Sequence, residues 1–162
     1  MDQMTPDEKR ALKRRMKSAA RLYAVQALFQ MEAAGQTVDA VRGEFETHRF
    51  GMVVEEGAFE EGNVDLFRRL LESAVNLQTR IDQLTDRGLA ERWPLGRIDP
   101  TLRALFRAAG AELLDSETPP KVVINEFVEV ARAFFPEGKE SGFVNAVLDF
   151  MAREAKPEAF TG

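Results

Sequence analysis

The sequence predicts an all-α fold, a helical bundle of about seven helices, and three observations support this prediction. Apolar residues recur at spacings of three and four, as they do on the buried face of a helix. No segment alternates apolar and polar residues for long enough to form a convincing strand. Proline and glycine lie between the periodic stretches, where helices begin and end. With 162 residues and 44% hydrophobic content, the chain is long enough for one domain with one core.

The first predicted helix, residues 7–33, has a basic half followed by an apolar half. Seven lysines and arginines and no acid lie between residues 9 and 21. Six of the seven cover an arc of about 140°, next to a narrow apolar stripe. From Leu22 onward apolar side chains point in nearly all directions, so we expect a buried core helix that ends at Gly35. The basic residues are Lys9, Arg10, Lys13, Arg14, Arg15, Lys17 and Arg21.

Five more helices are predicted, with a short helical turn between two of them. Asp99 and Pro100 form a strong start signal, because the carboxylate caps free amides and proline loses no hydrogen bond at the first helical position. Ser141 is expected to cap the last helix, and the tail from Lys156 is expected to be loose. The helices cover residues 38–50, 64–86, 100–114, Pro119-Pro120 to Phe135, and 142–155; the turn covers 89–92 and an acidic loop 51–62.

The charge of the chain is unevenly distributed. The formal net charge of -5 argues weakly against a nucleic-acid partner. However, the segment from Glu32 to Asp65 holds nine acids against two arginines, while the first helix begins with the acid-free basic run. Because phosphate contacts are local and gain from counterion release, this asymmetry matters more than the total.

The composition offers no active site, and we expect neither catalysis, a cofactor nor a bound metal. The chain has no cysteine, and its one histidine, His48, lies in an acidic segment where an ordinary surface role is expected. The glutamate pairs in 51–62 lack the spacing of a calcium loop, and no phosphate-binding glycine loop is present. No apolar run spans a membrane and the N-terminus does not resemble a signal peptide, so we expect a cytoplasmic protein.

From the residues alone, the basic arc has two interpretations. It is either a solvated helix face or a surface that binds RNA phosphates, and the paired arginines Arg14 and Arg15 favour RNA. Aromatic platforms for bases are scarce, since Tyr23 and Phe29 are better explained as core residues. Glu126 and Glu129 lie on the polar side of an apolar helix, and are either solvated or part of a protein-binding face.

Three segments together resemble the NusB family of bacterial transcription antitermination factors. Their order and spacing match from about residue 15 to 152, nearly the whole chain. Departures are Ala146, where the family usually has glycine, and Ala111, where a large residue is common. The segments are Ala20-Arg21-Leu22-Tyr23-Ala24-Val25-Gln26-Ala27-Leu28-Phe29; Trp93-Pro94-Leu95-Gly96-Arg97-Ile98 with Arg103-Ala104-Leu105-Phe106-Arg107 and Glu112-Leu113; and Pro120 to Ala131 followed by Phe143-Val144-Asn145-Ala146-Val147-Leu148-Asp149.

The resemblance implies a fold of two packed helical subdomains and a binding function. Members bind the boxA element of ribosomal RNA leader transcripts as a heterodimer with NusE, a small-subunit ribosomal protein, and help RNA polymerase to read through terminators. Trp93 is expected to be buried where the two subdomains meet. We predict partner contacts at Glu126 and Glu129, and RNA contacts at Lys13, Arg14, Arg15, Lys17, Arg21, Lys121 and Lys139.

The predicted organisation is a basic, partly helical extension over residues 1–13, a NusB-like RNA-binding domain over 14–155, and a flexible tail over 156–162. Two alternatives stay open. A helical protein-interaction module without specific RNA recognition is the stronger one. The same helical domain also occurs at the N-terminus of ribosomal RNA cytosine methyltransferases, but this chain has no cofactor-binding half and no cysteine nucleophile.

Overall fold

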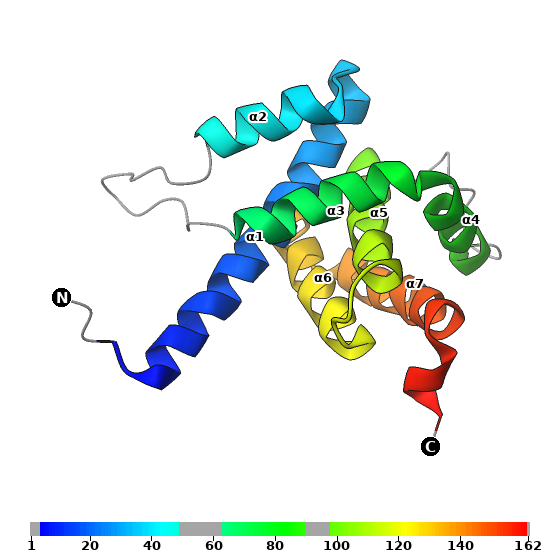
Figure 1. Cartoon of the computed structure of the whole chain (residues 1–162). Coiled ribbons are helices and arrows are strands. Elements are labelled where there is room, and N and C mark those ends of the chain that lie inside the picture. Colours follow the sequence, from blue (N-terminus) through cyan, green and yellow to red (C-terminus); the bar gives the residue numbers. More distant parts are fainter. Residues whose placement is uncertain (1–3, 49–62, 90–97, 162) are drawn as a thin grey trace.

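The computed structural model describes residues 4–48, 63–89 and 98–161, and within these ranges it contains helices and no strand (Figure 1). The predicted all-α class is therefore confirmed. The α-helices are α1 (Pro6–Ala34), α2 (Val38–His48), α3 (Val64–Asn76), α4 (Gln78–Leu89), α5 (Pro100–Leu114), α6 (Pro120–Phe134) and α7 (Lys139–Ala155). A 3-10 turn, η2 (Pro157–Phe160), follows α7.

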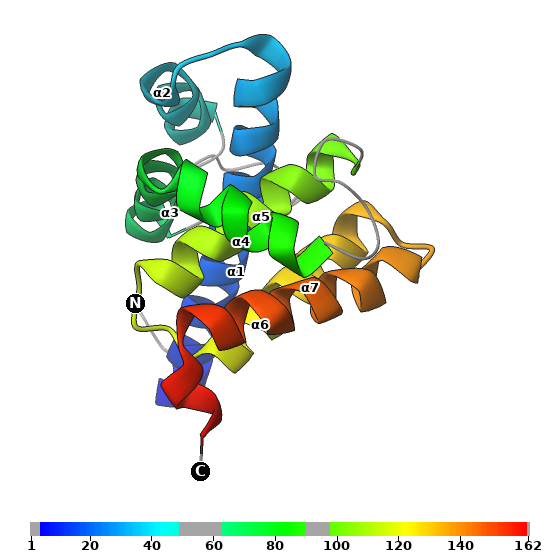
Figure 2. The same ribbon diagram turned by 90° about the vertical axis from the view of Figure 1, so that its right-hand side faces the viewer.

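Helix α5 is the central packing element of the fold. It contacts α1 and α3 and also α4, α6 and α7, so it joins the group α1–α3 to the group α4–α7. The two packed groups share one hydrophobic core, in which Phe67, Phe106 and Phe127 are fully buried. Figure 2 shows α7 across the front of the molecule with α6 behind it. At Gly110 of α5, an added Cβ would lie 2.5 Å from Ile81 Cγ2, so this glycine allows α4 to approach closely.

Helix α1 spans 29 residues and is anchored at both ends by its sequence. Thr5 caps its N-terminus in a capping box with Glu8, and Gly35 ends it in the left-handed conformation with φ of 67°. Its buried residues begin only at Ala19. The N-terminal half therefore extends away from the other helices (Figure 1), as the change from basic to apolar residues predicts.

Two predicted boundaries and one predicted cap were wrong. The segment 64–86 is two helices rather than one, because the chain leaves helical geometry at Leu77 (φ -109°, ψ 15°) and turns α4 towards α7. Helix α7 begins at Lys139, after Gly138 in the left-handed conformation. Ser141 is not its cap, since the hydroxyl lies inside the helix and donates to the Gly138 carbonyl at 2.9 Å.

Part of the tail after α7 contacts the helical body, and the predicted looseness of residues 156–162 stays a prediction. Lys156 Nζ donates to the Ser116 carbonyl oxygen at 2.5 Å, and the guanidinium of Arg153 lies 4.5 Å from the centre of the Phe160 ring. These contacts hold η2 against the helical body. The expected acidic loop 51–62, most of the turn at 89–92 and the predicted burial of Trp93 fall outside the described residues, so they stay predictions.

Candidate nucleic-acid interface

The exposed half of α1 presents a row of free cations. Lys13, Arg14, Arg15 and Lys17 are all exposed. None of these four forms a hydrogen bond or an ion pair with another residue that the structure describes. Earlier in the helix, Arg10 pairs with Asp7 of the first turn. Four unpaired cations within five residues are therefore available to the phosphates of a nucleic acid.

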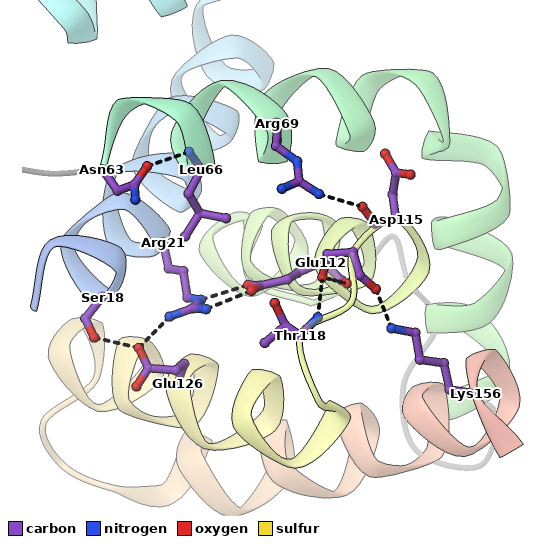
Figure 3. A network of polar contacts seen from close by, with 11 residues as sticks. Ser18, Arg21, Asn63, Leu66, Arg69, Glu112, Asp115, Thr118, Glu126 and Lys156 are labelled. Atoms are coloured by element: carbon purple, nitrogen blue, oxygen red, sulfur yellow. Dashed lines mark hydrogen bonds and ion pairs between the residues drawn. The ribbon is translucent and has the colours of Figure 1, made fainter. Parts of the chain in front are cut away.

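The start of α3 lies against α1 where its exposed half ends. The backbone N–H of Asn63 donates to the Met16 carbonyl oxygen at 2.9 Å. The same residue caps α3, since its Oδ1 accepts from the Leu66 N–H at 2.9 Å (Figure 3). This contact fixes the direction in which the basic half of α1 leaves the body of the protein.

Arg21 does not belong to the exposed face, which corrects our prediction that it is an RNA contact. Its side chain is only 5% exposed and points between α5 and α6. Nε and Nη2 donate to the two carboxylate oxygens of Glu112 at 2.8 and 2.7 Å, and Nη1 donates to Glu126 at 2.8 Å (Figure 3). A guanidinium whose donors are used inside the protein is not free to bind phosphate.

Ser18 of α1 completes the buried cluster, in which the positive charge of Arg21 faces the carboxylates of Glu112 and Glu126. The Ser18 hydroxyl donates to the same Glu126 oxygen at 2.6 Å. Burial acts to lower the pKa of Arg21, but its hydrogen bond and charge interaction with Glu112, together with Glu126, outweigh burial and raise that pKa. Arg21 therefore stays charged and ties α1 to α5 and α6.

Glu126 and Glu129, the predicted partner contacts, have different surroundings. Glu126 is 29% exposed and accepts from both Ser18 and Arg21, so it mainly holds α1. Glu129 is exposed and pairs with Arg132 one turn further along α6. No contact described here tests their predicted role with a partner, and it stays a prediction.

Lys121 and Lys139 are exposed, but they do not lie together. Lys121 is in the first turn of α6, and Lys139 begins α7 just after α6 ends. At 1.5 Å per residue, the length of α6 separates them by about 20 Å. Their predicted RNA contacts therefore require a strand that passes along α6, and these contacts stay predictions as well.

In residues 4–48, 63–89 and 98–161, no three His, Cys, Asp or Glu side chains gather in a way that holds a metal ion. Among the helices described, none combines the length and the apolar character that a membrane span needs.

Comparison with known proteins identifies the family. A sequence model of the NusB family matches residues 18–153. The chain belongs to the NusB family. The transcription antitermination protein NusB of Maricaulis maris (strain MCS10) is 46% identical over 157 residues, 96% of each chain. The protein of the same name from Caulobacter vibrioides is 48% identical over 141 residues, 86% of this chain and 94% of that one.

Solved structures agree with this NusB assignment. T. maritima NusB is 29% identical, with a TM-score of 0.68 over 88% of this chain and 95% of that one. The crystal structure of antitermination factors NusB and NusE in complex with dsRNA includes a chain with 22% identity and a TM-score of 0.70, covering 86% of this chain and 98% of that one. At that identity the likeness shows the NusB fold alone. The predicted family is confirmed, and with it the expectation of a binding protein rather than an enzyme.

Proposed function

We propose that the protein is a transcription antitermination factor that binds the boxA element of ribosomal RNA leader transcripts through the exposed half of α1. The observation that carries the proposal is the row of four exposed cations from Lys13 to Lys17, which pair with no residue in the described ranges, on a helix that extends from the core. Arginine forks match phosphate oxygens and stack on unpaired bases. Lys121 and Lys139 extend the contact along α6. This role places the protein in the cytoplasm, at the RNA polymerase antitermination complex.

We further propose that NusE is the protein partner and that it covers the surface around Phe29. Phe29 is 38% exposed and Val75 37%, which is unusual for large apolar side chains in this chain. One turn from Phe29, Glu32 lines a cavity of about 250 Å³ together with Met31 and Val75. Exposed aromatic and apolar groups beside charges are typical of protein interfaces. Glu129 remains a second predicted contact.

Charge reversal at Arg14 and Arg15 tests the RNA surface. Because each neutralised phosphate contributes about -0.7 to the log-log salt slope for single strands, four contacts give a slope of roughly -3. We expect the double change to Glu to weaken boxA binding at least ten-fold and to flatten the slope, while the circular-dichroism melt is unchanged. The measurement is fluorescence anisotropy of labelled boxA RNA at several salt concentrations.

The control is a double change with the same effect on net charge. Arg80→Glu with Arg87→Glu reverses two exposed arginines on α4. If both double variants weaken boxA binding equally, binding depends only on overall charge, and the proposal that RNA binds the exposed half of α1 is wrong. If neither does, boxA is bound elsewhere and the α1 surface is wrong. Absence of boxA binding to the unmodified protein would favour an interaction module without RNA recognition.

A further inference from the structure

A polar groove runs between α6 and α7. It has a volume of about 320 Å³, at the small end of the range of roughly 300–1,000 Å³ for sites that enclose one small organic group. Gly142 lies at its edge, and a Cβ added there would meet no atom within 4 Å, so the space above it is open. The side chains that line it are almost all polar: Asn125, Glu126, Glu129, Arg132, Ser141 and Asn145.

Two amides in this groove have unused hydrogen-bonding groups. Asn125 and Asn145 are exposed, and neither has a hydrogen bond to any residue in the described part of the chain. Ser141 donates its proton to the Gly138 carbonyl, which leaves the lone pairs of its oxygen free to accept. An amide places a donor and an acceptor side by side, which is the arrangement that pairs with the edge of a base.

The groove opens beside the basic half of α1. Glu126, which lines the groove, accepts hydrogen bonds from Ser18 and Arg21 of α1 (Figure 3). Arg14 lies one helical turn before Ser18 on the same side of α1, about 6 Å along the axis. A strand with its phosphates on Arg14 and its neighbours therefore has a base within reach of the groove.

We propose that the groove receives one unpaired base of the bound RNA and reads its edge, and that it prefers a base with an exocyclic amino group to uracil. This rests on the RNA-binding function proposed above. Asn125 and Asn145 supply the paired donor and acceptor. The second carboxylate oxygens of Glu126 and Glu129, which accept from no described residue, add acceptors, while Arg132 is engaged by Glu129, so amino protons are favoured over the carbonyl oxygens of uracil. The phosphate contacts on α1 provide affinity, and the groove provides base readout.

The test compares a short oligouridylate with the same strand carrying one adenosine or cytidine. Because the strand can slide, one amino-bearing base finds the groove from any position. We expect the substituted strands to bind roughly five-fold or more tightly, as one bidentate base contact implies. Asn145→Asp, which removes the amide donor, and Gly142→Leu, which fills the groove, are each expected to bring the affinity ratio close to one.

Gly43→Leu on α2 is the matched control, because a Cβ at Gly43 also meets no atom within 4 Å, and it is expected to keep the ratio. If the unmodified protein binds all strands equally and with a salt dependence, the groove does not read a base, while the proposed RNA-binding function stands. Absence of binding to every strand would overturn the proposed function itself. Loss of NusE binding in Gly142→Leu with an unchanged ratio would show a protein site instead.

Discussion

At the scale of single residues, Arg21 contributes most to positioning the basic half of α1, the proposed RNA-binding surface. Its three hydrogen bonds join α1 to α5 and α6. The side chains of Arg21 and Glu112 are 5% and 0% exposed, so neither charge has water to replace a lost partner. The cluster is therefore expected to hold the angle between the basic half of α1 and the rest of the protein.

Arg21→Leu is expected to lower the free energy of unfolding by about 3–5 kcal/mol, because it leaves Glu112 buried without its partner. Glu112→Gln in the same chain removes the orphaned charge and is expected to restore part of the loss. The measurement is urea unfolding followed by circular dichroism. Arg87→Gln is the control, since its pair with Glu154 is half exposed and contributes little. A loss no larger than that of the control would mean that the cluster does not hold α1.

The position of Arg21 also shows where the sequence stops being informative. On a helical wheel it continues the basic arc from Lys17, which is why we predicted an RNA contact. Its partners lie 91 and 105 residues away in the chain. Only the packing of α5 and α6 distinguishes a buried arginine from an exposed one. An acid at Glu112, within the otherwise apolar and alanine-rich stretch 108–114, was the available signal that a buried cation must face it.

At the scale of helices, prediction succeeded where a local signal marks the end of an element. Asp99 and Pro100 start α5, and its predicted bounds of 100–114 are those observed. The break between α3 and α4 has no such signal. Leu77 and Ile81 continue the apolar spacing across it, since Ile81 lies in the core and Leu77 packs against the core as the chain changes direction. Spacing reports which side chains are buried, not whether the axis is straight.

An ion pair between Glu46 of α2 and Arg68 of α3 is expected to respond to pH. The hydrogen bond from Arg68, opposed by burial and reinforced by the charges of Arg68 and Arg42, lowers the pKa of Glu46. A carboxylate with a lowered pKa contributes stability above its unfolded-state pKa, and this contribution is lost as the pH falls through the folded-state pKa. Glu46 therefore helps to fix α2 at neutral pH and not in acid.

Glu46→Gln is expected to be less stable than the unmodified protein at neutral pH. As the pH falls below the usual range of a glutamate pKa, the stabilities of the variant and the unmodified protein should converge, because protonated Glu46 is uncharged, as glutamine is. Urea midpoints measured across that pH range give the comparison. Glu72→Gln, whose carboxylate is more exposed in its pair with Arg42, serves as the control. A difference that is constant with pH would exclude the ion pair as its cause.

At the scale of the whole molecule, α1 carries both proposed binding surfaces on one continuous helix. The cations around Arg14 and the exposed ring of Phe29 are fifteen residues apart, about 22 Å along the axis. The net charge of -5 and the single basic segment indicate that RNA binding by this chain alone rests mainly on phosphate contacts. A basic partner at the other end of α1 adds contacts to the same strand, and complementary charges speed its encounter.

The affinity of the protein for boxA is therefore expected to rise several-fold in the presence of saturating NusE. Because coupling between two sites is reciprocal, boxA must raise the affinity of the protein for NusE by the same factor. Anisotropy titrations of boxA and of a scrambled RNA, each with and without NusE, measure the first effect. Titration of NusE with and without boxA measures the second. Phe29→Ala should reduce the enhancement, because it removes the exposed ring from the proposed NusE surface. Four identical RNA curves would leave only general polyanion binding, and an enhancement that is unchanged in Phe29→Ala would show that NusE binds elsewhere.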